Sequence, residues 1–264
     1  MHWTFGCPAV LVLAVAVNAP AQTRHLEARE CEDMSSDRAY HCEVREETLS
    51  GGNPLDVDAS PNGGIRVQGW DRTDVLVRAR IVGYADTDDE ARQIASQVRI
   101  ETGGGQIRAR GPERGDDRRW SVSYELSVPQ RSQLALRTVN GGIIVRDLLG
   151  NVTFKATNGG VRLENVGGDV HGETTNGGLQ IDLNGDRWDG NGLDVETHNG
   201  GINLRLPSHY SAELETGTTN GGLRVDFPVM VQGLVGKQLT TTLGAGGPKI
   251  RVMTHNGGVN IRRR

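Results

Sequence analysis

The tripeptide Asn-Gly-Gly occurs seven times in this chain of 264 residues, and its spacing constrains the fold more than any other feature. Three occurrences, beginning at Asn140, Asn158 and Asn176, follow one another at intervals of 18 residues. The later intervals are 23, 21 and 36 residues, and we interpret the last as two periods with one corner missing. A recurring period of this length is typical of folds in which small units stack on their neighbours. We expect equivalent corners at Asn62, Asn140, Asn158, Asn176, Asn199, Asn220 and Asn256.

Each clean repeat contains two short runs in which apolar and polar residues alternate. After Asn140, the first run places Ile143 and Val145 on one face, and the second places Val152 and Phe154 on one face. Alternation with a period of two is typical of a β-strand with one buried face. One repeat is therefore predicted to be two short strands separated by a turn.

Asn and Gly tolerate positive φ angles, so the tripeptide predicts a sharp reversal of the chain. An antiparallel meander would use Asn-Gly as a two-residue hairpin turn. A β-solenoid would place the same turn at one corner of every coil, where asparagine side chains can stack into a hydrogen-bonded ladder. Only the solenoid requires identical turns at a constant spacing. We therefore predict an all-β, single-domain β-solenoid of ~18-residue repeats.

One segment departs from the strand pattern. Residues 86–98 place Ala91, Ile94 and Ala95 on one helical face, and Thr87 begins a capping box. The sequence therefore predicts a short helical insertion between strands.

The outward positions predict a solvated face. The fourth residue after each Gly-Gly would form one column if the coils stack in sequence order, and opposite charges on adjacent strands would then pair. The net charge of −4, with both signs interspersed, gives no basis for a nucleic-acid partner. The column contains Arg146, Glu164, Asp182, Arg205 and Asp226.

The N-terminus has the pattern of a secretory signal peptide. Residues 9–17 are a short apolar run, and Ala19-Pro20-Ala21 is a small-x-small cleavage site. The alternative is an uncleaved membrane anchor, but the run is well short of the ~20 residues that a spanning helix needs. We predict cleavage after residue 21 and export to the periplasm or the cell surface, with no transmembrane span in the mature chain.

Cleavage would leave two cysteines, Cys31 and Cys42. A pair of this kind in an oxidising compartment usually forms a disulfide. The alternative is a metal site completed by His25 and His41, although the spacing fits no standard zinc pattern. We predict a disulfide within residues 22–53, a segment that would cap the first coil of a repeat domain at 54–264.

The order of several segments resembles a known family. A strand ending in Val-Pro (SYELSVPQ) precedes a strand that runs into Asn-Gly-Gly (SQLALRTVNGGIIV), and a Leu-Pro segment follows (INLRLPSHYSAELETGTTNGG). This order is similar to the bacterial putative adhesin family called domain of unknown function 4097, over residues 54–264. The resemblance implies a β-solenoid-like fold, an exported protein and, from the family's name, adhesion. It implies no catalytic residues.

The sequence contains no nucleophile elbow, Walker loop or paired-cysteine metal motif. In the extruded stretch 181–192, hard oxygen ligands suit calcium, but Arg187 occupies the position where an EF-hand needs Gly. A polar turn is the alternative, so we expect no metal and no cofactor. The weak calcium candidates are Asp182, Asn184, Asp186 and Asp189.

Two expectations concern the C-terminal repeats. His198 and His255 each precede an Asn-Gly-Gly and are expected as corner residues at least two coils apart. The chain ends in Arg262, Arg263 and Arg264, which are expected to protect an exposed edge strand by mutual repulsion.

We therefore predict an exported, non-enzymatic protein of the cell envelope that acts as a binding or structural module. Candidate partners are an envelope polysaccharide or a surface protein. The alternatives are a polysaccharide-acting β-helix enzyme, with Asp182, Asp186, Asp189 and Arg187 as its candidate cluster, and an accessory protein of the envelope-stress response.

Overall fold

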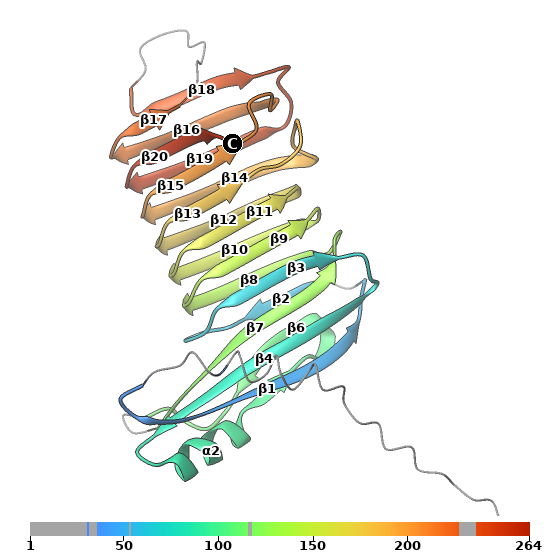
Figure 1. Cartoon of the computed structure of the whole chain (residues 1–264), viewed down its shortest axis with the longest axis vertical. Coiled ribbons are helices and arrows are strands. Elements are labelled where there is room, and N and C mark those ends of the chain that lie inside the picture. Colours follow the sequence, from blue (N-terminus) through green and yellow to red (C-terminus); the bar gives the residue numbers. More distant parts are fainter. Residues whose placement is uncertain (1–30, 32–35, 53, 116–117, 227–235) are drawn as a thin grey trace, which may run out of the picture. The chain divides into compact units, whose positions relative to one another are not determined.

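A computed structural model describes residues 31, 36–52, 54–115, 118–226 and 236–264 (Figure 1). The chain divides into two units, Met1–Ser35 and Ser36–Arg264, and the description below concerns the second. The predicted signal peptide at 1–21 lies outside the described residues.

Residues 36–264 form two ten-stranded sheets, so the prediction of an all-β chain is confirmed. The first sheet has the order β1 (Ala39–Ser50), β4 (Asp74–Ala85), β7 (Arg119–Pro129), β3 (Ile65–Trp70), β9 (Ile143–Leu148), β11 (Val161–Val166), β13 (Leu179–Asp182), β15 (Ile202–Leu206), β20 (Val259–Arg263) and β17 (Leu223–Val225). The second has the order β18 (Gln238–Leu243), β16 (Ala212–Asn220), β19 (Lys249–Asn256), β14 (Gly190–Asn199), β12 (Gly168–Asn176), β10 (Asn151–Asn158), β8 (Gln133–Asn140), β2 (Leu55–Asp58), β6 (Gln106–Arg110) and β5 (Arg99–Glu101).

Most neighbouring strands are parallel and in register. We call two consecutive strands joined by an Asn-Gly-Gly corner a coil; β10 and β11 are one example. β10 pairs in parallel with β8 and β12, and β11 pairs in parallel with β9 and β13. Antiparallel pairs lie toward the ends of the sheets, where β4 pairs with β1 and β7, β5 with β6, and β18 with β16.

The core lies between the two sheets. In most strands the inward residues are buried and apolar, and the parallel register places them over one another as columns. Alternation with a period of two therefore produced the buried face that the sequence predicted. One column of the first sheet consists of Ile143, Val161, Leu179, Ile202 and Val259.

The coils do not stack in sequence order. The last coil, β19 and β20, is inserted inside the stack: β19 lies between β14 and β16, and β20 lies between β15 and β17 (Figure 1). The expectation that the C-terminal arginines protect an edge strand is therefore wrong. Arg262 instead forms an ion pair with Asp226, at 3.6 Å.

The helix α2 (Asp88–Gln97) confirms the predicted insertion. Its N-cap Thr87 accepts a hydrogen bond from the amide of Glu90 at 3.3 Å, and Ala91, Ile94 and Ala95 are buried. A short 3₁₀ turn, η1 (Gly103–Gly105), precedes β6. Within the described part of the chain, no helix has the length and apolar character needed to cross a bilayer.

Candidate functional site

The seven corner asparagines form one hydrogen-bonded ladder. Each asparagine after the first donates from Nδ2 to Oδ1 of the preceding member, at 2.8 or 2.9 Å. The side chains are exposed, so each bond contributes at the low end of the ~0.5–1.5 kcal/mol that is typical. The spatial order is Asn62, Asn140, Asn158, Asn176, Asn199, Asn256 and Asn220.

The corner glycines are required by close stacking, and the expectation of a positive φ at these turns is wrong. None of the described Asn-Gly-Gly residues is among those with positive φ. A Cβ on Gly159 would lie 1.9 Å from the carbonyl oxygen of Gly141 in the next coil, which is an impossible contact. A Cβ on Gly160, the second glycine, would lie 3.3 Å from the oxygen of Gly178, which a small shift relieves. Close contacts between 1.8 and 2.2 Å recur at the other first glycines: Gly63, Gly141, Gly177, Gly200, Gly221 and Gly257.

A row of buried threonines supports the ladder, and sequence reasoning missed it. Two residues before the corner asparagine, Thr174 donates from Oγ1 to the carbonyl oxygen of Gly159 at 2.8 Å. The signal in the sequence is the longer motif Thr-x-Asn-Gly-Gly, which is broken where Ala156 replaces threonine. The same bond to a first glycine is made by Thr138, Thr197, Thr218 and Thr254.

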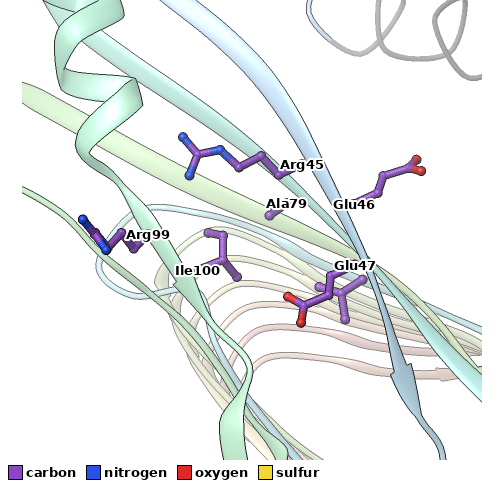
Figure 2. A pocket seen from close by; sticks show the side chains of 7 residues that line it. Arg45, Glu46, Glu47, Ala79, Arg99 and Ile100 are labelled. Carbon is purple, nitrogen blue, oxygen red and sulfur yellow. The ribbon is translucent and has the colours of Figure 1, made fainter. Parts of the chain in front are cut away.

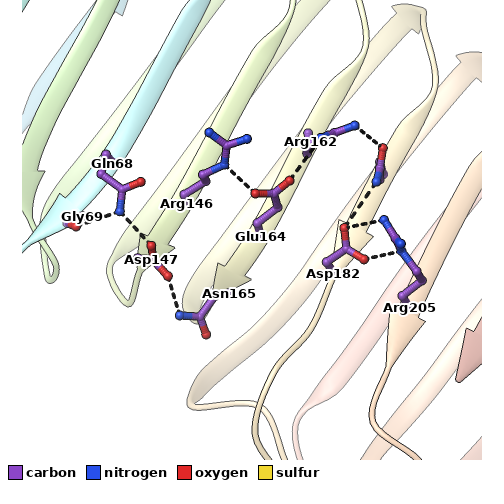
Figure 3. Close-up of polar contacts among 10 residues, drawn as sticks. Gln68, Gly69, Arg146, Asp147, Arg162, Glu164, Asn165, Asp182 and Arg205 are labelled. Carbon is purple, nitrogen blue, oxygen red and sulfur yellow. Dashed lines mark hydrogen bonds and ion pairs between the residues drawn. The ribbon is translucent and has the colours of Figure 1, made fainter. Parts of the chain in front are cut away.

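The outward face of the first sheet carries the mixed-charge column that the sequence predicted. The last coil is inserted within this column. Glu164 accepts a hydrogen bond from Arg146, and Asp182 pairs with Arg205 (Figure 3). Arg162 donates to Gln180 at 2.7 Å and connects the two ion pairs (Figure 3). The hydrogen bond from Arg146, followed by the positive charges of Arg146 and Arg162, lowers the pKa of Glu164.

A second row at the end of these strands involves residues with positive φ. Asp147 and Asn165 have φ of 53° and 52°, which Asn and Asp tolerate better than other non-glycine residues. Asn165 donates to Asp147 at 2.6 Å, and Gln68 donates to the other oxygen of Asp147 at 2.7 Å (Figure 3). The side-chain bonds therefore stabilise successive strand ends.

These two rows line an open polar hollow of about 340 Å³. Its three carboxylates, Asp147, Glu164 and Asp182, each accept hydrogen bonds from neighbouring side chains. A general acid needs a raised pKa, whereas Glu164 has a lowered one. The carboxylates that line the hollow are therefore already bound by neighbouring side chains of the chain itself.

The stretch proposed for calcium anchors a loop. Asp182 is held by Arg205, and Asn184 accepts a hydrogen bond from Arg264. The backbone carbonyls of Asp186 and Asp189 accept bonds from Ser211 and Gly168, at 2.7 and 2.6 Å. Among the described residues, no three His, Cys, Asp or Glu side chains form a group that could hold a metal ion.

The buried Trp188 explains the position of this loop. Its side chain is 3% exposed, and its Nε1 donates to the carbonyl oxygen of Gly168 at 3.0 Å. Burial of so large a side chain, with its polar atom satisfied, stabilises the loop that lengthens the interval between Asn176 and Asn199 to 23 residues.

A pocket of about 480 Å³ lies against β1, β4 and β5 (Figure 2). Val77 and Ala79 provide a buried apolar floor, and Ile100 is partly buried. Arginine and glutamate side chains of β1 and β5 provide the polar rim. Such a pocket suits a small ligand with an apolar body and a charged group.

Arg45 on this rim also caps the helix. It donates to the carbonyl oxygens of Val98 and, at 3.1 Å, Ala95, at the C-terminal end of α2. The last turn of α2 contains no basic residue, so Arg45 supplies from β1 the positive charge that stabilises a helix C-terminus. Sequence reasoning could not find this contact, because 50 residues separate Arg45 from Ala95.

Three further groups lie outside the rows and pockets described above. Cys31 and Cys42 are disulfide-bonded. Tyr124 is 2% exposed, and burial followed by the charge of Asp58 raises its pKa far above the usual range. His198 and His255 lie in adjacent coils with ring centroids 4.5 Å apart, so the expected separation of at least two coils is wrong.

Comparison with known proteins gives one family and several distant structures. Residues 130–262 match the model of the Toastrack DUF4097 family. No curated protein matches the sequence.

The solved structures are similar at low identity. A putative cell adhesion protein from Clostridium sporogenes is 10% identical, with a TM-score of 0.46 over 84% of this chain and 100% of that chain. A putative adhesin from Bacteroides fragilis is 10% identical, with a TM-score of 0.34 over 85% and 97%. A putative lipid binding protein from Parabacteroides distasonis is 11% identical, with a TM-score of 0.34 over 84% and 97%. The family model covers just over half of the chain, and the protein belongs to the Toastrack DUF4097 family.

Proposed function

We propose that this chain is an exported β-solenoid that acts as a rigid binding or structural module of the cell envelope and catalyses no reaction. The observation that carries the proposal is the uninterrupted asparagine ladder from Asn62 to Asn220, which ties seven corners into one body. In-register parallel strands on both sides of that ladder are the arrangement that a solenoid requires. Such a body presents flat faces with strands at a regular spacing of about 4.8 Å.

The disulfide-bonded Cys31 and Cys42 support export, because disulfides persist mainly in oxidising compartments. The signal-peptide pattern at 1–21 supports the same conclusion. Cell fractionation and N-terminal sequencing test this part. We expect a mature chain that begins at Gln22 outside the cytoplasm, and an uncleaved cytoplasmic chain would contradict export.

The charged surface supports binding rather than catalysis. The three carboxylates of the hollow are held by neighbouring side chains, and the lowered pKa of Glu164 is opposite to what a general acid needs. The partner class that we propose is an envelope polysaccharide or a surface protein, since a regular polar face suits an extended polar polymer.

Retention of the purified protein on immobilised envelope polysaccharides and envelope proteins tests the binding role. We expect one fraction to retain the wild-type protein and to release the double variant Arg146→Ala, Arg205→Ala. The matched control is Arg92→Ala, on the exposed face of α2 and remote from the column. If no fraction retains the protein, the binding role is wrong, and release of new sugar ends from a polysaccharide would contradict the non-enzymatic role.

A further inference from the structure

Two exposed histidines face each other across adjacent coils. His198 on β14 and His255 on β19 have ring centroids 4.5 Å apart and an interplanar angle of 38°. The pairing follows from the inserted last coil, whose register places Thr254 opposite Thr197 and Asn256 opposite Asn199. In sequence order the two residues are 57 positions apart.

Hydrogen bonds of the residues next to these two histidines hold the backbone in place. Thr197 and Thr254 donate to glycine carbonyl oxygens at 2.7 and 2.8 Å, and Asn256 donates to Asn199 at 2.8 Å. Both Cβ atoms are therefore fixed by structure that exists without a ligand. The rings are exposed and free to rotate about their side-chain torsions.

The separation suits one metal ion bound by both rings. With metal–nitrogen bonds of about 2.0–2.1 Å, two imidazoles at a right angle have centroids about 4.5 Å apart, and at the tetrahedral angle about 5.2 Å. Right-angled ligands are typical of tetragonal Cu²⁺ and Ni²⁺ rather than of tetrahedral Zn²⁺. The observed 4.5 Å equals the right-angled value, and rotation of the exposed rings also reaches the tetrahedral value, so the separation suits a metal ion without selecting its geometry.

The two imidazole ligands favour copper. Glu196 and Met253 lie opposite each other, two residues before the histidines and on the same outward side of their strands. A thioether favours Cu⁺, whereas Cu²⁺ has the highest affinity of the first-row divalent ions for nitrogen ligands. The carboxylate of Glu196 is 3.8 Å from Arg251, which lies opposite Asp194 and therefore draws it away from the pair, so the two rings are the protein ligands.

We propose that His198 and His255 bind one Cu²⁺ ion on the surface of the second sheet. Each histidine supplies one neutral ring nitrogen, and water fills the remaining positions. This is a binding site that does not depend on the envelope role proposed above.

Titration of the untagged full-length protein with CuCl₂, followed by calorimetry and electron paramagnetic resonance, tests the proposal. We expect one equivalent of Cu²⁺ with a two-nitrogen spectrum, and a loss of affinity of more than about tenfold in His198→Thr and in His255→Thr. Threonine occupies the same place in neighbouring coils, at Thr157, Thr175 and Thr219, so both variants should fold. Unchanged thermal unfolding without metal checks that they do.

The chain offers one matched control and one gain-of-function variant. His171→Thr removes an exposed histidine of β12 that contacts Asp169, and it should leave the binding unchanged. Thr175→His adds a third ring beside His198 and should tighten binding by about tenfold. Weaker binding of copper by other exposed side chains would be the same in all of these variants. The proposal is wrong if the wild-type protein binds no copper, or if the losses in His198→Thr and His255→Thr do not exceed the loss in His171→Thr.

Discussion

The side-chain amide of Asn256 donates a hydrogen bond to Oδ1 of Asn199 at 2.8 Å, across 57 positions of the chain. Asn220 lies between them in the sequence, yet it contacts Asn256 from the other side, also at 2.8 Å. The C-terminal coil is therefore an internal part of the stack, and it separates two coils that are consecutive in the sequence.

Deletion of residues 248–264 should destabilise the coil of β16 and β17 more than any coil before β14. Without β19 and β20, these strands lose their parallel partners and the apolar contacts of Ile250, Val252 and Ile261. Hydrogen exchange should show lost protection at 212–225 and retained protection at 134–166. Deletion of 262–264 alone is the control and should leave both regions protected. If residues 212–225 were as well protected in the long deletion as in the wild-type protein, the inserted arrangement would be contradicted.

Gly159→Ala should destabilise the fold by about 2 kcal/mol or more, because its Cβ meets the backbone oxygen of Gly141 at 1.9 Å. Gly160→Ala is the matched control. Its nearest contact is 3.3 Å, so we expect a loss below about 1 kcal/mol. Urea unfolding measures the stability of both variants. Equal losses of stability would show that close stacking does not determine the choice of glycine.

Ala156→Thr should be more stable than Ala156→Val, which has nearly the same shape but no hydroxyl. Threonine at this position can donate to the carbonyl oxygen of Gly141, as Thr174 does to that of Gly159. Such a bond contributes about 0.5–1.5 kcal/mol. Thermal unfolding compares the two variants. A valine variant as stable as the threonine variant would contradict the role assigned to the threonine row.

The pairing of Glu164 with Arg146 should make a small contribution to stability that disappears in acid. The pKa of Glu164 is lowered in the folded chain, so its contribution is fully present above the unfolded pKa of about 4.3 and is lost as the pH falls through the lower folded value. The pair is partly exposed, so we expect less than about 1 kcal/mol. Urea unfolding of wild type and Glu164→Gln should differ at pH 7 and converge in acid, below the lowered pKa of Glu164. A difference that does not change with pH would contradict this assignment.

Arg45→Ala should loosen the C-terminal end of α2, because the carbonyl oxygens of Ala95 and Val98 lose a charged donor. Hydrogen bonds to charged groups contribute about 1.5–3 kcal/mol, and partial exposure places the expected loss at the lower end. Arg99→Ala, on the rim of the same pocket, is the control and should stay within about 0.5 kcal/mol of wild type. If Arg45→Ala and Arg99→Ala lost the same amount of stability, the capping role would be contradicted.

The local features of the fold could be predicted from the sequence. The alternation around Val152 and Phe154 and the capping box at Thr87 are determined by near neighbours in the chain, and the structure has strands and a helix there. The all-β class followed from these patterns.

The stacking order could not be predicted, because it depends on which pairs of coils fit best in space. The interval of 36 residues before Asn256 is the trace of the insertion in the sequence, and we interpreted it as a missing corner. For the same reason, the contact of His198 with His255 and the cap from Arg45 were not predicted. The threonine row was missed for a different reason, since its motif is visible in the sequence.

The inserted coil also determines when the molecule can be completed during synthesis. A ribosome delivers β16 and β17 before β19 and β20, so the earlier pair lacks its parallel neighbours until residues 249–263 are made. A nascent chain that ends near residue 248 presents two unpaired edges, one on β14 and β15 and one on β16 and β17, that match the same missing segment. The coil of β19 and β20 therefore closes the stack. A chain that stops before this coil is made has a gap that residues 248–264 of another copy can fill.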